Sequence, residues 1–191
     1  MPDEPELVPA AAPQATAERP ARASRRVVVV LVVAVVVLVV DQLTKVWALS
    51  ALGIERRAVV GDLLGLQLTR NPGAALSIAT GMTWVLTLVA AGVVVVVLRT
   101  ARRATSNAWT VTFGLLLGGA LGNLGDRLFR DPGPLRGHVV DFIAYSDWFI
   151  GNVADIAIVV AAGLVMLLVA RGVRLDGTRE VRRPASHRAD G

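Results

Sequence analysis

The 191-residue chain contains no cysteine and only two histidines. The lack of cysteine excludes a disulfide framework, a thiolate metal site and a cysteine nucleophile. Two histidines leave a histidine-based metal cluster close to excluded, so we expect no metal ion. The sequence also has no Walker or dinucleotide-binding fingerprint and no internal repeat. Any chemistry in this chain therefore has to use other side chains.

Charged residues are also scarce, at 18%, whereas 54% of the residues are hydrophobic and the mean hydropathy is +0.59. A soluble domain of this length normally carries more charge. The net charge of +5 could suggest a nucleic-acid partner. However, the basic residues lie mostly in the two polar ends and one short loop, beside apolar runs. A membrane surface explains that placement better, and we expect no nucleic acid.

Both ends of the chain differ in composition from its middle. Residues 1–26 are rich in Pro, Ala, Glu and Arg, and residues 171–191 are rich in Arg, Asp and Gly. Such segments bury too little apolar surface to offset their chain entropy. We therefore predict two disordered tails around a central domain at 27–170.

Four apolar runs in the central domain are long enough to cross a bilayer. They cover about residues 27–49, 82–98, 108–124 and 153–170. Valine runs can suggest strands, but an isolated span in lipid has to satisfy its backbone internally and is therefore helical. The first run is long for a signal peptide and lacks a small-x-small cleavage site, so we interpret it as a retained span. The sequence thus predicts an all-α membrane protein, a bundle of four transmembrane helices.

The distribution of basic residues predicts the orientation of this bundle. Four spans place both termini on one side, where the tails and the 99–107 loop hold 13 of the 20 Lys and Arg residues, against seven on the other side. Because positive residues favour the cytoplasmic side, both tails should be cytoplasmic. The connections at about 50–81 and 125–152 should then lie outside.

Two further patterns concern local packing. Residues 64–70 alternate like a half-buried strand, and Val59-Val60 could pair with them. This predicts a small extracytoplasmic β-sheet on the outer membrane face. In the third span, Gly114, Gly118 and Gly122 recur every four residues, which allows another helix to approach closely.

Polar residues interrupt or border the apolar runs near the predicted outer interface. They are Asp41, Gln42, Thr44 and Lys45 at the end of the first span, Asn71 before the second, Asn123, Asp126 and Arg127 at the end of the third, Asp141 in the outer loop, and Asn152 and Asp155 at the start of the fourth. Ionisable groups at membrane depth cost a few kcal/mol, so they tend to face the bundle interior and mark function.

Some of these residues also have ordinary structural explanations. Asp41 and Lys45 form an i, i+4 pair at a helix end, which favours a supporting role over a catalytic one. The stretch 71–73, Asn-Pro-Gly, is a turn signal on propensity alone. Asp126 and Arg127 could form a helix-end ion pair.

Asp155 is harder to explain as structural, because five apolar residues follow it directly in the sequence. Asp141 likewise lies between Val-Val and Phe-Ile. Two carboxylates close together cannot both ionise easily, so one keeps a proton. Such a pair can activate water with one member and protonate a carbonyl with the other. We therefore predict aspartic-protease chemistry at Asp141 and Asp155, with Asp126 as a rival third acid.

Five stretches of this chain resemble motifs of the lipoprotein signal peptidases (signal peptidase II), a family of bacterial membrane aspartyl proteases. They occur in the family's order and together cover about residues 27–170. The stretches are DQLTK at 41–45, NPGAA at 71–75, GGALGNLGDR at 118–127, VVDF at 139–142 and NVAD at 152–155.

The resemblance implies the site residues and the substrate. Its catalytic pair corresponds to Asp141 and Asp155. Residues that would line the site and orient substrate are Asn71, Gly73, Asn123, Arg127 and Asn152, with Asp41 and Asp126 in the supporting polar shell. The implied substrate is a prolipoprotein whose cysteine carries diacylglycerol, cut just before that cysteine in the bacterial cell membrane. No cofactor is implied, and we expect a monomer surrounded by membrane lipids.

Two positions depart from the family pattern. Gly151 stands where the family usually has an aromatic residue, and Leu76 stands where it usually has Phe. Two other classes of protein stay open as alternatives. A small proton-coupled transporter also carries acids in helices, although transporters usually place their site at the midplane between repeats. A non-catalytic membrane adaptor would not need two neighbouring acids.

Overall fold

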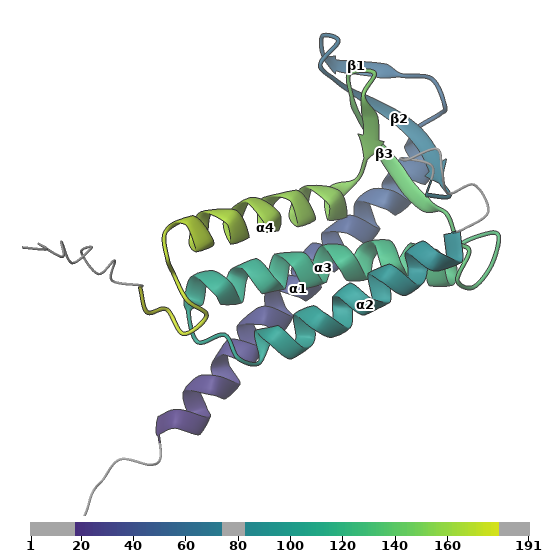
Figure 1. Ribbon diagram of the computed structural model, residues 1–191. Helices are drawn as coiled ribbons and strands as arrows, with labels where there is room; N and C mark the ends of the chain where they lie inside the picture. The colour runs from purple at the N-terminus through teal and green to yellow at the C-terminus, as the bar shows by residue number, and fades with distance from the viewer. Residues whose placement is uncertain (1–17, 74–82, 180–191) are drawn as a thin grey trace, which may run out of the picture.

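The computed structural model describes residues 18–73 and 83–179, and these residues form a helical bundle with a small sheet at one end (Figure 1). The elements in chain order are α1 (Glu18–Ala51), β1 (Arg57–Val60), β2 (Leu64–Asn71), α2 (Thr83–Ala101), α3 (Asn107–Phe129), β3 (Val139–Tyr145), β4 (Phe149–Gly151) and α4 (Val153–Ala170). Each of the four helices is long and apolar enough to cross a membrane. The predicted bundle is thus confirmed, and α4 has the predicted bounds.

The helix α3 lies at the centre of the bundle, because α1, α2 and α4 all pack against it. Its glycine stripe faces α1. A Cβ atom placed on Gly114 would lie 2.6 Å from Val33 Cβ, and one on Gly118 would lie 2.6 Å from Val37 Cβ. Real side chains cannot approach that closely, so the glycines permit the helix contact that the sequence predicted.

The boundaries predicted for the two tails were wrong in part. The helix α1 begins at Glu18 rather than at residue 27, because the Ala and Arg residues of this segment favour helix and Pro20 is tolerated in a first turn. Residues 171–179 are also ordered. Their residues Val173 and Leu175 pack against the buried core, and Thr105 N–H donates to the Leu175 carbonyl over 2.8 Å. The rest of the predicted tails, 1–17 and 180–191, and Leu76 lie outside the described residues.

The four strands form one antiparallel sheet in the order β1-β2-β3-β4. The strands β1 and β2 confirm the predicted pairing. The placement of Asp141 in a loop was wrong, because residues 139–145 form β3. This strand is buried on both faces at most positions, so its sequence lacks the alternation that marks a half-exposed strand.

The sheet lies at one end of the bundle, next to the end of α1 and the start of α4 (Figure 1). Trp47 of α1 packs edge-on against Phe142 of β3, with ring centroids 6.1 Å apart. The strand β2 ends at Asn71, and β4 leads through Asn152 directly into α4. The ends of β2, β4, α1 and α3 consequently meet around β3, where the predicted site residues lie.

Candidate active site

Asp141 lies in β3 with only 2% of its surface exposed. Two asparagine side chains bind its carboxylate. Asn71 Nδ2 donates to Oδ2 over 2.8 Å, and Asn152 Nδ2 donates to Oδ1 over 2.6 Å. A buried carboxylate is costly unless such donors satisfy it. The pairing of β2 with β3 therefore brings Asn71 next to Asp141, and Asn71 is one of the two donors that stabilise the buried carboxylate.

The Asn71-Pro72-Gly73 segment forms a turn that holds the Asn71 amide. Gly73 N–H donates to Asn71 Oδ1 over 2.8 Å. Gly73 has a φ of 109°, which favours glycine, and a Cβ atom here would collide with the Leu86 side chain. The turn predicted from propensity is thus present, and it fixes the Asn71 amide that binds Asp141.

Asp155 lies in the first turn of α4 and is half-buried. It forms a capping box with Asn152, in which Asn152 N–H donates to Asp155 Oδ2 over 3.0 Å and Asp155 N–H donates to Asn152 Oδ1 over 3.0 Å. Its other oxygen, Oδ1, accepts a hydrogen bond from Asn123 Nδ2 over 2.8 Å. The helix cap and α3 together fix this carboxylate.

Asn152 joins the two carboxylates and is fully buried. Its side-chain amide donates to Asp141 and also to Asn123 Oδ1, the latter over 3.1 Å, while its backbone N–H binds Asp155. The negative charge of Asp155 also acts on Asp141. The two acids therefore share one neighbour, and the charge of Asp155 reaches Asp141.

Lys45 supports this arrangement from α1, and its side chain is fully buried. Its Nζ lies 2.8 Å from Asp41 Oδ2, 2.8 Å from Asp126 Oδ2 and 3.1 Å from Asn123 Oδ1. An ammonium group has three donors, and each has a partner here. The predicted Asp41–Lys45 pair is confirmed, but it belongs to a larger network that reaches the asparagine beside Asp155.

Asp41 and Asp126 tie the helices to the site. Asp41 Oδ1 accepts the Ala154 N–H over 2.9 Å, and Asp126 Oδ2 accepts the Val140 N–H over 3.1 Å. The predicted ion pair between Asp126 and Arg127 was wrong. Asp126 instead pairs with Lys45 and with Arg130, whose Nε lies 2.6 Å from Oδ1, because neighbours in a helix do not face each other whereas residues four apart do.

Gly122 allows Asp41 to reach this network. A Cβ atom at Gly122 would lie 2.5 Å from Asp41 Oδ2, so Gly122→Ala has to displace the carboxylate from Lys45. We expect this variant to lose about 1–3 kcal/mol of stability, measured by thermal unfolding in detergent. Gly125→Ala is the matched control on the same helix, since nothing lies within 4 Å of its added Cβ. Equal stability of the two variants would contradict the role assigned to Gly122.

Among the described residues, the Arg127 side chain lies outside this hydrogen-bond network. Its Nη1 is buried and has no hydrogen-bond partner among the described residues. The charges of Asp141, Asp126 and Asp155 all act on its guanidinium. An unused donor close to the two acids is available to a bound substrate. Within residues 18–73 and 83–179, no group of three or more His, Asp or Glu side chains is arranged to hold a metal ion.

Comparison with known proteins shows the family of this chain. Residues 33–171 match the family described as Signal peptidase (SPase) II. The chain belongs to the signal peptidase II family. It is 51% identical over 144 residues to the lipoprotein signal peptidase of Rhodococcus jostii (strain RHA1), covering 75% of this chain and 73% of the relative. It is 48% identical over 177 residues to that of Mycobacterium avium (strain 104), covering 92% and 93%.

Solved structures are similar as well. A bacterial membrane enzyme determined by the in meso method at 2.3 Å resolution superposes with a TM-score of 0.66 at 26% identity, covering 80% of this chain and 94% of that one. Together with the four apolar helices, this similarity identifies a multi-pass membrane protein. Membership of the signal peptidase II family confirms the predicted removal of signal peptides from prolipoproteins, and the transporter alternative is not supported.

The departure from the signal peptidase II pattern at Gly151 has a local explanation. A Cβ atom at Gly151 would lie 3.1 Å from Asp155 Oδ2 and 3.4 Å from the Phe149 ring. Phe149 in turn stacks on Tyr145, with ring centroids 4.6 Å apart. Aromatic rings from β3 and β4 thus border the space beside Asp155, although position 151 itself carries no side chain.

The environment of Asp141 favours its protonated form. Burial raises the pKa of Asp141 to about 6, and the negative charge of Asp155 raises it as well. The hydrogen bonds from Asn71 and Asn152 act in the opposite direction, since they stabilise the ionised carboxylate. A pKa this close to neutrality suits a group that has to gain and lose a proton during a reaction.

Sequence reasoning underestimated Lys45 and did not include Gln42 or Arg130 among the site residues. Gln42 Nε2 donates to Asp126 Oδ1 over 3.2 Å and to the Gly122 carbonyl over 3.2 Å. Arg130 pairs with the same carboxylate. A sequence signal did exist for Lys45, because a lysine next to an apolar run has to be paired and hydrogen-bonded if it is buried.

Proposed function

We propose that this signal peptidase II family member is an aspartic endopeptidase in which Asp141 and Asp155 form the catalytic pair. The observation that carries the proposal is Asn152, which binds both carboxylates in a buried position. The raised pKa of Asp141 supports it further, because one member of such a pair has to hold a proton.

The reaction requires one carboxylic acid and one carboxylate. The carboxylate removes a proton from water, and the water oxygen bonds to the peptide carbonyl carbon while the acid protonates the carbonyl oxygen. The tetrahedral intermediate then collapses, the C–N bond breaks, and the amine nitrogen takes a proton from the pair. The new carboxyl terminus belongs to the signal peptide. Neither step requires a cofactor.

The neighbours of the pair have supporting roles in this proposal. Asn71 and Asn152 orient Asp141, while Asn123 orients Asp155 and is itself held by Lys45. Arg127, whose Nη1 has no partner among the described residues, would donate to a substrate carbonyl beside the scissile bond. Asp41 and Asp126 hold the Lys45 side chain in place.

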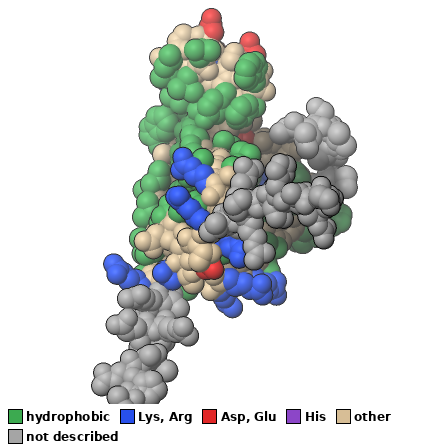
Figure 2. All heavy atoms as spheres, turned by 60° about the vertical axis from the view of Figure 1, so that its left-hand side comes forward, with side chains coloured by type: hydrophobic (Ala, Val, Ile, Leu, Met, Phe, Trp, Pro, Cys, Tyr) green, Lys and Arg blue, Asp and Glu red, His purple; other side chains and the backbone are tan. Residues whose placement is uncertain are grey.

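We further propose that the sheet and the aspartate pair lie at the outer face of the cell membrane, with the described chain ends in the cytoplasm. The 13 Lys and Arg residues on the side of the two ends, against seven on the other, support this orientation. On the face drawn in Figure 2, basic side chains gather around one end of the bundle, next to a hydrophobic surface. That arrangement is typical of a cytoplasmic membrane boundary.

The proposed substrate is a prolipoprotein whose cysteine already carries diacylglycerol, cleaved just before that cysteine. The relatives' name, lipoprotein signal peptidase, supports this substrate class. Acyl chains anchored in the outer leaflet would hold the scissile bond at the depth of the two acids. The lipid would thus reduce the entropy cost of bringing peptide and carboxylates together.

The decisive experiment compares two precursors that differ only in the diacylglyceryl group. Purified protein in detergent or proteoliposomes should release the signal peptide from the lipid-modified precursor and leave the unmodified one largely uncut, as judged by gel mobility and mass of the products. Equal cleavage of both precursors would contradict the proposed lipid requirement. Cleavage of neither would contradict the proposed peptidase reaction.

The pH dependence of cleavage tests the proton assigned to the pair. With the pKa of Asp141 at about 6, kcat/KM should fall as pH rises through that value, because the protonated form is lost. Asn71→Ala removes a hydrogen bond that stabilises the ionised form, so the pKa of Asp141 rises and the falling limb moves to higher pH. The measurement is the pH profile of kcat/KM for both proteins.

The control for this comparison is Gln67→Ala. Gln67 lies on the same strand, and its side chain makes none of the described hydrogen bonds to Asp141. Its profile should match the parent protein. A falling limb that moves to lower pH in Asn71→Ala, or does not move, would contradict the assignment of the titrating group to Asp141.

A further inference from the structure

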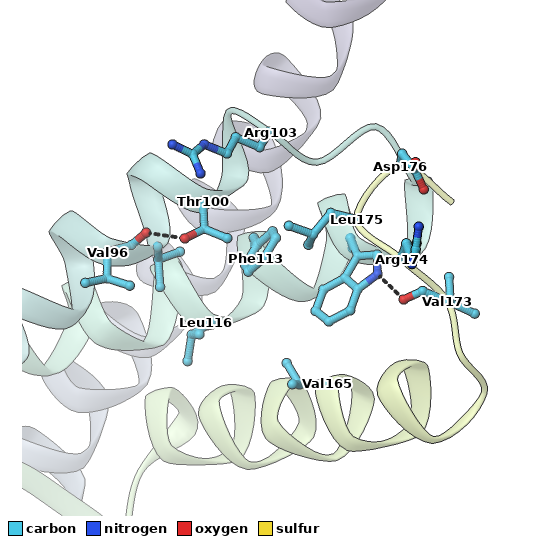
Figure 3. A pocket seen from close by; sticks show the side chains of 12 residues that line it. Val96, Thr100, Arg103, Phe113, Leu116, Val165, Val173, Arg174, Leu175 and Asp176 are labelled. Carbon is cyan, nitrogen blue, oxygen red and sulfur yellow. Dashed lines mark hydrogen bonds between the residues drawn. The ribbon is translucent and has the colours of Figure 1, made fainter. Parts of the chain in front are cut away.

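The end of the bundle remote from the aspartate pair contains an apolar groove (Figure 3). The helices α2 and α4 both pack against α3 but scarcely contact each other, so a space of about 780 Å³ remains between them. Trp109, Phe113 and Leu116 of α3 form its floor, while Val96 and Val165 line the two sides. The segment 173–176 closes one end.

The polar atoms bordering this groove are largely satisfied within the protein. Trp109 Nε1 donates to the Val173 carbonyl over 3.1 Å, and Thr100 Oγ1 donates to the Val96 carbonyl over 2.8 Å, as Figure 3 shows. What remains is a hydrocarbon surface beside two membrane-spanning helices. A groove of this kind is filled by hydrocarbon rather than water, since ordered water requires polar partners.

Three charged residues, Arg103, Arg174 and Asp176, also line the groove. Figure 3 shows Arg103 on α2, apart from Arg174 and Asp176, which lie together on the segment after α4. Arg174 and Asp176 carry opposite charges that act on each other. A guanidinium binds a phosphate group through a planar pair of donors, so Arg103 complements an anionic lipid headgroup.

The groove is separate from the aspartate site. Its floor residue nearest to that site, Leu116, precedes Asn123 by seven residues along α3, which corresponds to about 10 Å of helix. None of the groove's lining residues belongs to the hydrogen-bond network of the carboxylates, so the inference does not depend on the proposed peptidase mechanism.

We propose that this groove is a binding site for an anionic phospholipid, with one acyl chain between α2 and α4 and the phosphate at Arg103. The apolar floor accepts the chain, and Arg103 selects the headgroup. A zwitterionic lipid enters the same groove with lower affinity, because its net charge is zero.

Trp109 provides a reporter within the groove. In a variant carrying Trp47→Phe, Trp84→Phe and Trp148→Phe, it is the remaining tryptophan of the four in the chain. Only 7% of its surface is exposed, so lipid outside the groove reaches it poorly. This protein is reconstituted in phosphatidylcholine vesicles that contain a small fraction of either phosphatidylglycerol or phosphatidylcholine brominated on the acyl chains, and bromine quenching of Trp109 is measured.

Brominated phosphatidylglycerol should quench Trp109 at about one-fifth of the mole fraction that brominated phosphatidylcholine requires, the preference expected from one arginine at an anionic headgroup. Arg103→Gln should remove most of this preference. Arg102→Gln is the matched control, because Arg102 is the adjacent residue and does not line the groove. Equal quenching by both lipids, or an equal loss in the two arginine variants, overturns the headgroup assignment.

A second pair of variants tests the position of the acyl chain. Val165→Phe places a ring in the groove and should strongly reduce quenching by either brominated lipid. Met166→Phe is the control, since Met166 is 68% exposed and does not line the groove. Quenching that is absent in the unmodified groove, or unchanged by Val165→Phe, overturns the proposed site.

Discussion

Asp141→Asn and Asp155→Asn should each reduce cleavage of a lipid-modified precursor by at least roughly a thousandfold, the scale of general acid–base catalysis by a positioned side chain. Asparagine has nearly the same shape as aspartate but can neither take a proton from water nor deliver one to the carbonyl. The measurement is the single-turnover rate of signal-peptide release with purified variant in excess over precursor. Retention of more than a few per cent of the rate in either variant would exclude the pair.

Loss of activity has to be separated from loss of structure. The Asp141→Asn amide has one acceptor oxygen where Asn71 and Asn152 each donate, so this variant loses one hydrogen bond, and its cleavage rate is compared in the folded fraction as judged by thermal unfolding. Asp147→Asn is the matched control, because Asp147 is exposed in the turn between β3 and β4. This variant should keep the parent rate. If it were as inactive as Asp141→Asn, the effect could not be assigned to the buried pair.

Lys45→Met should cause the largest loss of stability, about 3–5 kcal/mol, because it leaves Asp41 and part of the Asp126 charge buried without their cation. Methionine fills a similar volume, so the loss reports charge rather than packing. It should also release Asn123 from Lys45 and reduce cleavage even in protein that remains folded. Thermal unfolding in detergent and the cleavage rate of the folded fraction measure the two effects.

Combining Lys45→Met with Asp41→Asn distinguishes a charge effect from a general disturbance. The second substitution removes one of the uncompensated charges, so the double variant should be more stable than Lys45→Met alone. Arg57→Met, at an exposed position in β1, provides a surface control and should change stability by less than about 0.5 kcal/mol. A double variant that is less stable than either single variant would contradict a charge network centred on Lys45.

The spans and their approximate ends could be predicted because lipid imposes a strong local rule. A run of about 20 apolar residues has to form a helix whatever its neighbours are, and α4 accordingly has the predicted bounds. The ends that extend into water follow different rules. The start of α1 at Glu18 depends on helix propensity, and the order of 171–179 depends on Val173 and Leu175 finding the bundle core.

The strand β3 shows where pattern reasoning fails. Apart from Asp141, its residues Val139–Tyr145 are largely apolar on both faces because the strand is covered on both sides, and a short run of this kind does not distinguish strand from loop or helix. The sequence of the half-buried β2 keeps a recognisable alternation and was predicted, and Val59-Val60 of the exposed β1 was predicted as its partner. The sequence therefore predicted Asp141 as a site residue but placed it in a loop instead of a strand.

The partner of Asp126 is a similar case. The sequence places Arg127 beside it, yet Lys45 from α1 and Arg130 from the next helical turn neutralise it. Adjacent residues in a helix point in different directions, so the sequence neighbour is the wrong one. The contact to Lys45 joins residues on two different helices and depends on how α1 crosses α3 at Gly118 and Gly122.

The sequence by itself determined the four helices, the family and the identities of the acids, amides and glycines, since these depend on composition, spacing and short motifs. Only the tertiary structure decided that Asn152 binds both aspartates and that Lys45 donates a hydrogen bond to Asn123. It also decided that α2 and α4 leave a groove between them. These features depend on side chains from different elements meeting in space, and such distances follow from helix packing and strand register rather than from any local pattern.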